Sequence, residues 1–397
     1  MVDYKGKLVL APMVRAGELP TRLLALKHGA ELVWSPEIID KKIITCERFE
    51  NTKLGTVDFL SKDKTRIPGV TNLVFRTYPK LESNKLIFQM GTSNIDLALE
   101  AAKLIINDVS GIDINAGCPK HFSIHSGMGA ALLKTPDLLC SILENLVVKI
   151  GKPNNKPISV KIRLFPSEED SLQLIERLCK TGISNLTVHC RTQPMRNREF
   201  PIRNYISKIK KITDFHKITL IINGGILDKS DFIKNIQSKY EDGKDLGGMI
   251  ATTAEQNPTC FRDEPLPWYE MIKEYVNFAE LVDNYIGNSK YMLLKMIPGR
   301  SKLYQIISQC KTYDDMKEVL KDVEPYKNDK FKATPFVTIK RDDNGNEITD
   351  KKKSTEKNFK DHINDGKKHK LPDSEKIQDQ ESTQLKKPHT EKTVTTA

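Results

Sequence analysis

The sequence predicts a (β/α)8 TIM barrel followed by a small all-helical domain and a disordered C-terminal tail. Eight short apolar runs of strand character recur over about 260 residues, and amphipathic helical patterns separate several of them. Strand-like runs stop near Pro267, where purely helical patterns begin. Eight strand and helix units in this length match the usual size of such a barrel, with an open doubly wound sheet as the structural alternative.

The alternation of strands and helices predicts a barrel domain over residues 1–265. The predicted strands lie within residues 7–13, 32–38, 86–91, 111–119, 158–164, 185–191, 219–226 and 247–253. Apolar residues recur every three or four positions in residues 96–108 and 137–150, as an amphipathic helix requires. Residues 41–84 interrupt the alternation and mix β-branched residues with Gly55, Pro68 and Gly69, which predicts an inserted hairpin.

The chain after the barrel divides into two parts. Residues 266–330 carry three helical runs, at 268–286, 291–310 and 312–323, and predict a helical domain. Residues 331–397 are rich in Lys, Asp, Thr and Gln and poor in apolar residues. Such a composition buries too little surface to offset the entropy of ordering, so we expect a disordered, lysine-rich tail.

Composition excludes several classes of protein. The chain is 38% hydrophobic and 29% charged, and it holds no apolar run near the roughly 18 residues of a membrane span. Its N-terminus has no secretory signal pattern, and its seven cysteines form no C-x-x-C pair. We therefore expect a soluble, monomeric, cytoplasmic protein without a metal site or disulfide framework, and leave open whether the tail directs nuclear import.

The net charge points to an anionic partner. Of the +11 total, residues 331–397 contribute 15 basic and 12 acidic side chains, so most of the surplus falls in the first 330 residues. Nucleic-acid binding explains this surplus, and surface lysines that serve solubility explain it equally well.

Polar side chains and glycines gather where the predicted strands end, which is the catalytic face of such barrels. A lone Lys161 or His189 inside a strand would more often be a satisfied structural residue, but the two lie in adjacent strands and Gln89 lies in a third. Together they predict a polar ligand in the barrel mouth. The loops “INGGI” and “IATT” follow strands seven and eight, where backbone amides commonly bind a phosphate, so we expect a phosphorylated cofactor.

The stretch “NAGCPKHFSIHSGMGAALL” at residues 115–133 places Cys118 between glycine and proline. Taken alone, a free cysteine is more often a buried packing residue than a reagent. The run “GMGAAL” at 127–132 lacks the third glycine of a dinucleotide-binding fingerprint and does not join a strand to a helix, so its glycines indicate a tight turn beside a ligand.

The chain closely resembles the tRNA-dihydrouridine synthases, specifically the eukaryotic type that acts on position 20 of tRNA, over about residues 5–330. Five segments carry the resemblance in the same order: “LAPMVRAGELPTRLLALKHGAELVWSPEIID”, “NAGCPKHFSIHSGMGAALL”, “VKIRL”, “HCR” and “NGGI”. The short segments are weak signals singly, whereas N-x-G-C-P together with the opening “APM” and the spaced Lys and His is highly specific.

The resemblance implies an FMN-dependent enzyme that uses NADPH as reductant and a C-terminal helical domain that helps to hold tRNA. It implies that hydride passes from reduced flavin N5 to uracil C6, that Cys118 donates the proton to C5, and that Asn115 orients the uracil. A cysteine with an ordinary pKa of about 8.5 is mostly a thiol at neutral pH and suits this role. The implied FMN-binding residues are Pro12, Met13, Val14, Gln89, Lys161, His189, Asn223, Gly224, Gly225, Ala251 and Thr252.

One position departs from the family pattern. Family members commonly carry an arginine after the eighth strand, where this chain has Ala251 and Thr252. The resemblance then implies that the Thr252 hydroxyl and backbone amides contact the phosphate, with a weaker electrostatic contribution.

Reducing a base within folded tRNA requires taking it out of its stack, so binding elsewhere must offset that cost. Candidate tRNA contacts are Arg191, Arg196 and Arg198 after strand six, and Lys290, Lys295, Arg300 and Lys302 in the helical region. A solvated helix face explains the second set equally well.

Two other functions compete with this hypothesis. One is an FMN-barrel reductase of a free pyrimidine or another small enone, against which the basic surplus and the helical appendage argue. The other is a tRNA-binding protein that has lost catalysis, against which the intact Cys118, Lys161 and His189 argue.

Overall fold

The computed structural model describes residues 2–62, 72–120, 125–299 and 301–323. All of these residues belong to one compact unit of the chain. The predicted tail at 331–397 and Arg300, a predicted tRNA contact, lie outside the described residues.

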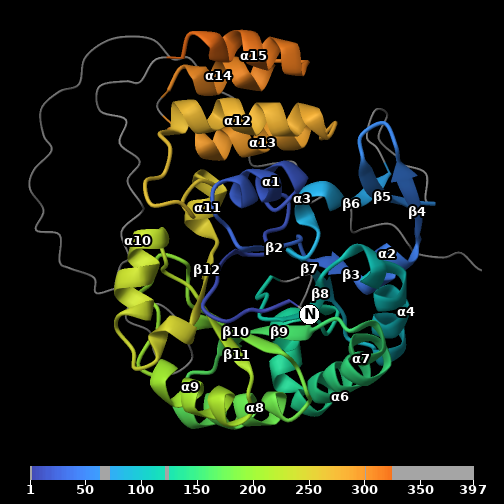
Figure 1. The fold of residues 1–397 in the computed structure, drawn as a ribbon, viewed down its shortest axis with the longest axis vertical. Coiled ribbons are helices and arrows are strands. Elements are labelled where there is room, and N and C mark those ends of the chain that lie inside the picture. Colours follow the sequence, from blue (N-terminus) through green and yellow to red (C-terminus); the bar gives the residue numbers. More distant parts are fainter. Residues whose placement is uncertain (1, 63–71, 121–124, 300, 324–397) are drawn as a thin grey trace, which may run out of the picture. The chain divides into compact units, whose positions relative to one another are not determined.

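Eight parallel strands form a closed barrel (Figure 1). They are β1 (Leu8–Leu10), β2 (Leu32–Trp34), β7 (Leu86–Gly91), β8 (Gly111–Ala116), β9 (Ile158–Leu164), β10 (Asn185–Thr192), β11 (Thr219–Asn223) and β12 (Gly247–Ile250). Neighbours around the barrel follow chain order, β1 pairs with β12, and the pairing of β2 with β7 completes the circle. The short β3 (Ile38–Ile39) adds to the end of β7. The predicted (β/α)8 barrel is confirmed, and each predicted run matches one of its strands, with β10 ending one residue beyond its run.

Helices surround the strands, as the outer ring in Figure 1 shows. The longer ones are α1 (Leu19–Lys27), α4 (Ile95–Ile105), α6 (Pro136–Leu146), α8 (Glu168–Cys179) and α9 (Ile206–Phe215). Shorter ones are α7 (Lys152–Asn154), α10 (Lys229–Phe232), α11 (Thr252–Gln256), η1 (Ile106–Asp108), η2 (Gly129–Lys134), η3 (Val147–Gly151), η4 (Ile233–Gln237) and η5 (Gly243–Asp245). The side chains of Asn94 and Ser167 accept backbone N–H bonds and so start α4 and α8.

The alternation of side chains along each strand decides what the barrel interior contains. On β9, Ile158, Val160 and Ile162 belong to the apolar core that the helices cover. The intervening Ser159 and Lys161 face the interior, because successive strand side chains point to opposite faces. Ser159 lies opposite Asp113 of β8, and Lys161 lies opposite Asn115. The interior of this barrel is therefore polar toward its C-terminal end.

Among its described residues, the insertion between β3 and β7 contains three strands instead of the predicted two. The antiparallel strands β4 (Cys46–Asn51), β5 (Thr56–Ser61) and β6 (Leu73–Thr77) lie between the short helices α2 (Asp40–Ile44) and α3 (Pro79–Glu82). Its tight turn contains Gly55 at a φ of +69°, whereas Pro68 and Gly69 lie outside the described residues. The third strand is held by tertiary packing, since Phe75 stacks on Phe59 and Phe88, with ring centroids 5.8 and 5.3 Å away.

In the described part of the chain, four helices follow the barrel: α12 (Trp268–Leu281), α13 (Ile286–Met296), α14 (Leu303–Gln309) and α15 (Tyr313–Lys321). They share one apolar core, to which Ala16 and Leu24 of the barrel domain also belong. Helix α12 packs directly on α1 (Figure 1). Among the described residues, none of the helices combines the length and apolar character that a membrane span needs.

A buried polar network ties these parts together. The guanidinium of Arg22 on α1 bonds the carboxylate of Glu82, with 2.6 Å between Nε and Oε1, and neither side chain is exposed. Arg22 also donates to the carbonyl oxygens of Gly17 and Arg76, at 2.9 and 2.7 Å. Arg76 in turn donates to the carbonyl of Val282, which directly follows α12. One buried arginine thus connects the loop after β1, the inserted sheet and, through Arg76, the helical domain.

Candidate active site

A cleft of about 510 Å³ opens at the C-terminal ends of the barrel strands, a size that suits a cofactor or drug-sized ligand. The predicted site residues that line it are Pro12, Met13, Val14, Gln89, Asn115, Cys118, Lys161, His189, Arg191, Arg198, Asn223, Gly224, Gly225, Ala251 and Thr252. Arg196 and Lys295 are not part of its wall. Residues predicted at the ends of seven different strands therefore meet in one cavity, while their individual roles stay predictions.

Hydrogen bonds with three residues, Asn115, Arg163 and Ala130, fix the backbone of the loop that carries Cys118. Oδ1 of Asn115 accepts the backbone N–H groups of Gly117 and Cys118, at 2.9 and 3.1 Å. Arg163 donates from Nε to the carbonyl oxygen of Gly117 at 3.0 Å, and the N–H of Ala130 donates to the carbonyl oxygen of Cys118 at 2.9 Å. Cys118 is half-buried at the edge of the cleft. Its thiol therefore has a defined place beside any molecule bound there.

The glycine-rich run after Cys118 turns the chain beside this loop. Gly127 and Gly129 adopt positive φ values of +73° and +59°, which glycine reaches without strain. The run then enters η2, whose Ala130 supplies the bond to Cys118. This geometry agrees with the predicted tight turn and has no strand leading directly into a helix.

A carboxylate beneath the cleft organises the polar interior. Asp113 accepts hydrogen bonds from Nε2 of Gln89 at 2.8 Å and from Oγ of Ser159 at 2.7 Å. Burial raises the pKa of Asp113 to about 6, although these bonds and nearby Lys161 oppose the shift. Because the Gln89 amide nitrogen is bound to Asp113, its oxygen is left as an acceptor for a ligand.

Lys161 is a buried cation of the cleft wall. It makes no hydrogen bond or ion pair to any other residue that the structure describes. Burial, with a further contribution from Arg163, lowers the pKa of Lys161 to about 8, while Asp113 opposes that shift. Its ammonium is therefore protonated at neutral pH and available to an anionic or carbonyl-bearing ligand.

His189 is neutral in the folded protein. Burial, and then the positive charges of Lys161, Arg163 and Arg191, lower its pKa well below the ordinary value. Arg191 lies with Nη1 3.1 Å from Nε2 of His189, and since a guanidinium can only donate, Nε2 accepts. The proton of the imidazole therefore sits on Nδ1.

The structure does not support the predicted tRNA contact at Arg191. Its side chain is 2% exposed, and it donates from Nε and Nη2 to the carbonyl oxygen of Glu199, at 2.8 and 2.6 Å. Arg191 holds this loop and His189 in place. Arg196 and Arg198 lie on the exposed part of the same loop and keep their predicted place at the surface.

The helical domain contributes Tyr291 to the cleft, a residue that sequence reasoning missed. The guanidinium of Arg15 lies 4.2 Å from its ring centroid, and the ammonium of Lys295 lies 5.5 Å from it. Arg15 reaches this position from a left-handed backbone conformation, with a φ of +66°. Lys295 also lies 3.8 Å from the carboxylate of Glu255, so this rim of the cleft is cationic and partly neutralised.

Three further residues near the site were not selected from the sequence: Asp113, Arg163 and Glu37. The alternation of side chains along a strand could have identified the first two. Asp113 and Arg163 lie two positions from Asn115 and Lys161 on the same strands, and period-two alternation places each pair on one face. Glu37 lines the cleft near Cys118 and Asn115, whose side chains hydrogen-bond its carboxylate, while burial raises its pKa. Sequence alone gave no measure of that proximity.

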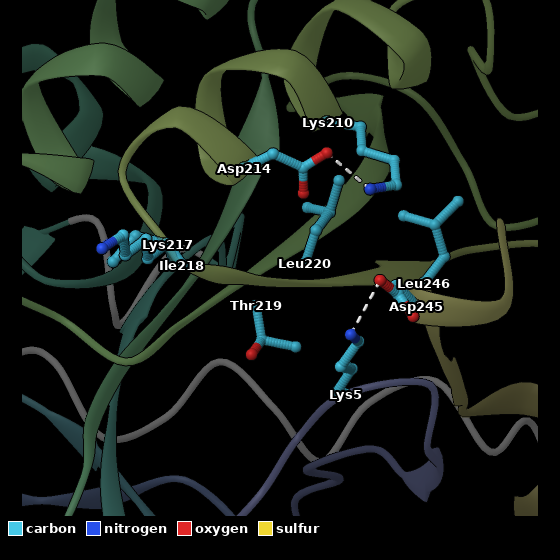
Figure 2. A pocket seen from close by; sticks show the side chains of 9 residues that line it. All are labelled: Lys5, Lys210, Asp214, Lys217, Ile218, Thr219, Leu220, Asp245 and Leu246. Carbon is cyan, nitrogen blue, oxygen red and sulfur yellow. Dashed lines mark hydrogen bonds and ion pairs between the residues drawn. The ribbon is translucent and has the colours of Figure 1, made fainter. Parts of the chain in front are cut away.

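A smaller hollow of about 240 Å³ lies at the opposite end of the strands, since Thr219 begins β11 and Leu246 directly precedes β12. Figure 2 shows the side chains that line it. Two of its cations are paired, Lys5 with Asp245 at 2.9 Å and Lys210 with Asp214 at 2.6 Å. The N-terminal end of such barrels serves stability, so we assign no ligand to it. Within the described ranges, no group of three or more His, Cys, Asp or Glu side chains is placed to hold a metal ion.

The raised pKa of Asp113 leads to a pH-dependent prediction. A carboxyl that titrates near 3.9 in the unfolded chain and at about 6 when folded contributes most stability below pH 4, and loses it as the pH rises through 6. Urea unfolding from pH 4.5 to 7.5 is therefore expected to show wild-type stability falling relative to that of Asp113→Asn up to about pH 6.5. Parallel curves for the two proteins would contradict the burial of an ionisable group here.

Comparisons with known proteins identify the family of this chain. A family model described as dihydrouridine synthase (Dus) matches residues 9–342. This chain belongs to the dihydrouridine synthase family. Its predicted family and its predicted standing as an enzyme are thereby confirmed.

Curated relatives in this family include proteins from two yeasts. The tRNA-dihydrouridine(20) synthase of Saccharomyces cerevisiae is 56% identical over 329 residues, which cover 81% of this chain and 85% of that protein. The protein of the same name from Schizosaccharomyces pombe is 45% identical, covering 85% of this chain and 69% of its own length. The tRNA-dihydrouridine(20a/20b) synthase of Saccharomyces cerevisiae is 27% identical, covering 66% and 63%.

Proposed function

We propose that this dihydrouridine synthase reduces the C5=C6 bond of uridine 20 in tRNA to 5,6-dihydrouridine, with FMN as cofactor and NADPH as reductant. The observation that carries the proposal is the cleft itself, where Cys118 is held on a fixed loop beside Lys161 and His189. The higher identity to relatives named for position 20 than to the one named for 20a/20b supports the choice of uridine.

The cleft fits a phosphorylated flavin. A Cβ at Gly224 would lie 2.9 Å from Cδ2 of His189 and 3.0 Å from Nη1 of Arg191, so the backbone here forms a cradle without side chains. Asn223, Gly224 and Gly225 would hold the phosphate, and Thr252 would add its hydroxyl. Gln89, Lys161 and His189 would contact the ring and ribityl chain, with Pro12, Met13, Val14 and Ala251 completing the wall.

When bound and reduced, FMN supplies the hydride that reaches uracil C6. Cys118 donates the proton to C5, and the resulting thiolate recovers a proton from water. Asn115 and Arg163 keep the Cys118 loop in position for this transfer. Lys161 stays protonated at neutral pH because its pKa of about 8 lies above 7, so it can stabilise negative charge that develops on the bound ring system.

The helical domain and the exposed arginines after β10 would bind the tRNA and offset the cost of extruding the base. The described candidates are Arg196, Arg198, Lys290, Lys295 and Lys302, and Arg300 lies outside the described residues. We propose that the enzyme acts as a monomer in the cytoplasm.

Removal of one rim charge is expected to weaken tRNA binding measurably. Replacing Lys295, whose side chain is 44% exposed, with glutamine should lower the slope of log K against log salt by about 1, because one phosphate contact is lost. The matched control is Lys208→Gln on α9, which removes one charge from the outer ring of helices. Equal slopes for both variants and the wild type would reject Lys295 as a tRNA contact.

The function is tested by following the flavin. Purified protein should show a flavin spectrum that NADPH bleaches, and unmodified tRNA should restore it while free uridine does not. Reoxidation by free uridine would favour the small-molecule reductase, and a protein that takes up no FMN but binds tRNA would favour the non-catalytic alternative.

A further inference from the structure

The phosphate end of the cleft is built from an unusual piece of backbone. Gly224 and Gly225, which follow β11, both have positive φ values, +103° and +73°. Their peptides line the cleft, and the place where a side chain would stand at Gly224 is filled by His189 and Arg191. Only backbone groups of this turn can therefore meet a ligand.

Arg203 lies behind this turn and is not part of the cleft wall. Its Nη2 donates to the carbonyl oxygen of Gly224 at 3.0 Å. Its Nε is buried and has no hydrogen-bond partner among the described residues. The hydroxyl of Tyr240 donates to the carbonyl oxygen of Arg203 at 3.2 Å and anchors its backbone.

This bond fixes the direction of one amide. In a trans peptide the C=O and the N–H point in opposite directions, so holding the carbonyl of Gly224 toward Arg203 turns the N–H of Gly225 the other way. Arg203 lies outside the cleft and Gly225 lines it. The N–H of Gly225 is therefore presented to the cleft as a donor for an anion.

Arg203 is a cation that hydrogen-bonds the backbone of this turn. Arg191 also approaches Gly224, but its guanidinium is engaged by Glu199 and His189. The neighbouring Ala251 and Thr252 after β12 carry no charge. Arg203 lies on the side of the Gly224–Gly225 peptide that faces away from the cleft, and its buried Nε has no hydrogen-bond partner among the described residues. Its guanidinium therefore contributes a positive potential at this peptide.

We propose that Arg203 is the positioning residue of the phosphate site: it orients the Gly224–Gly225 peptide and supplies the positive charge that Thr252 does not. The inference rests on the proposed use of FMN. Charge-assisted hydrogen bonds contribute roughly 1.5–3 kcal/mol, which corresponds to an affinity change of about 10- to 100-fold.

The test compares FMN with riboflavin, which has the same ring and ribityl chain but no phosphate. Full-length protein freed of flavin is titrated with each, and binding is read from the quenching of flavin fluorescence. Arg203→Met is expected to weaken FMN binding about 10- to 100-fold and to leave riboflavin binding within about twofold. Arg203→Lys should retain most of the FMN affinity, and Lys208→Met on α9 should behave as wild type.

A charge placed on the cleft side provides the second arm. In the double variant Arg203→Met with Thr252→Arg, FMN affinity should return toward the wild-type value, because Thr252 lines the cleft and follows β12, the neighbour of the strand that precedes Gly224. Equal loss of FMN and riboflavin in Arg203→Met, or unchanged FMN binding, would overturn the proposal. So would failure of both the lysine variant and the double variant to retain FMN affinity. A wild-type protein that binds neither flavin would instead refute the proposed function.

Discussion

Replacing Cys118 with alanine is expected to lower the rate of dihydrouridine formation by at least about 100-fold while the protein keeps its flavin, because general acid catalysis typically contributes 10²- to 10⁴-fold. The loop that carries Cys118 is held by Asn115, Arg163 and Ala130 through backbone groups, which the substitution leaves intact. The measurement is single-turnover reduction of unmodified tRNA by the NADPH-reduced protein, with the flavin spectrum recorded in parallel.

Cys140 provides the matched control for this substitution. It is half-buried on α6 and is not part of the cleft wall, so Cys140→Ala should keep turnover within about twofold of the wild type. Full activity of Cys118→Ala would remove the proton-donor role. Loss of flavin from that variant would instead make Cys118 a packing residue of the cofactor site.

Replacing Arg22 with methionine is expected to lower the free energy of unfolding by about 3–5 kcal/mol, the largest stability effect that the structure predicts. Arg22 and Glu82 are both fully buried, so removing the guanidinium leaves a buried carboxylate without its ion-pair partner. Adding Glu82→Gln should recover part of the loss, because an amide can keep the hydrogen bonds from Thr77 and Tyr78 without a buried charge.

The exposed pair of Lys5 and Asp245 is the control for this experiment. Their side chains are 60% and 45% exposed, and Lys5→Met should leave the stability close to that of the wild type, because solvent screens an exposed ion pair. Denaturant unfolding of the four proteins measures both effects. A loss below about 1 kcal/mol for Arg22→Met would show that the buried network does not hold the parts of the molecule together.

The barrel could be predicted because each strand is recognisable from its own local sequence pattern. Short β-branched runs such as 219–223 and 158–164 recur with helical patterns between them, and that repetition specifies the class of fold. The C-terminal ends of the strands then identify the catalytic face of the barrel. Lys161, His189 and the Cys118 loop could therefore be assigned to one site from the sequence alone.

The remainder depends on contacts between distant residues, which local patterns do not encode. Arg22 and Glu82 are 60 positions apart, and Arg203 meets Gly224 across 21 positions. Arg191 was predicted as a tRNA contact because its loop is basic, yet its side chain is buried and donates to the carbonyl oxygen of Glu199. Tyr291 reaches the cleft only because α12 and α13 pack against the barrel domain.

The most direct test of the account is to map dihydrouridine on tRNA treated with the enzyme. Unmodified transcript is incubated with the flavin-loaded protein and NADPH, beside a transcript that carries cytidine at position 20, and dihydrouridine is located by mass spectrometry of nuclease fragments. The account predicts dihydrouridine at position 20 of the first transcript and none in the second. A reduced, flavin-loaded protein that leaves uridine 20 unchanged, or that modifies another uridine in both transcripts, would contradict it.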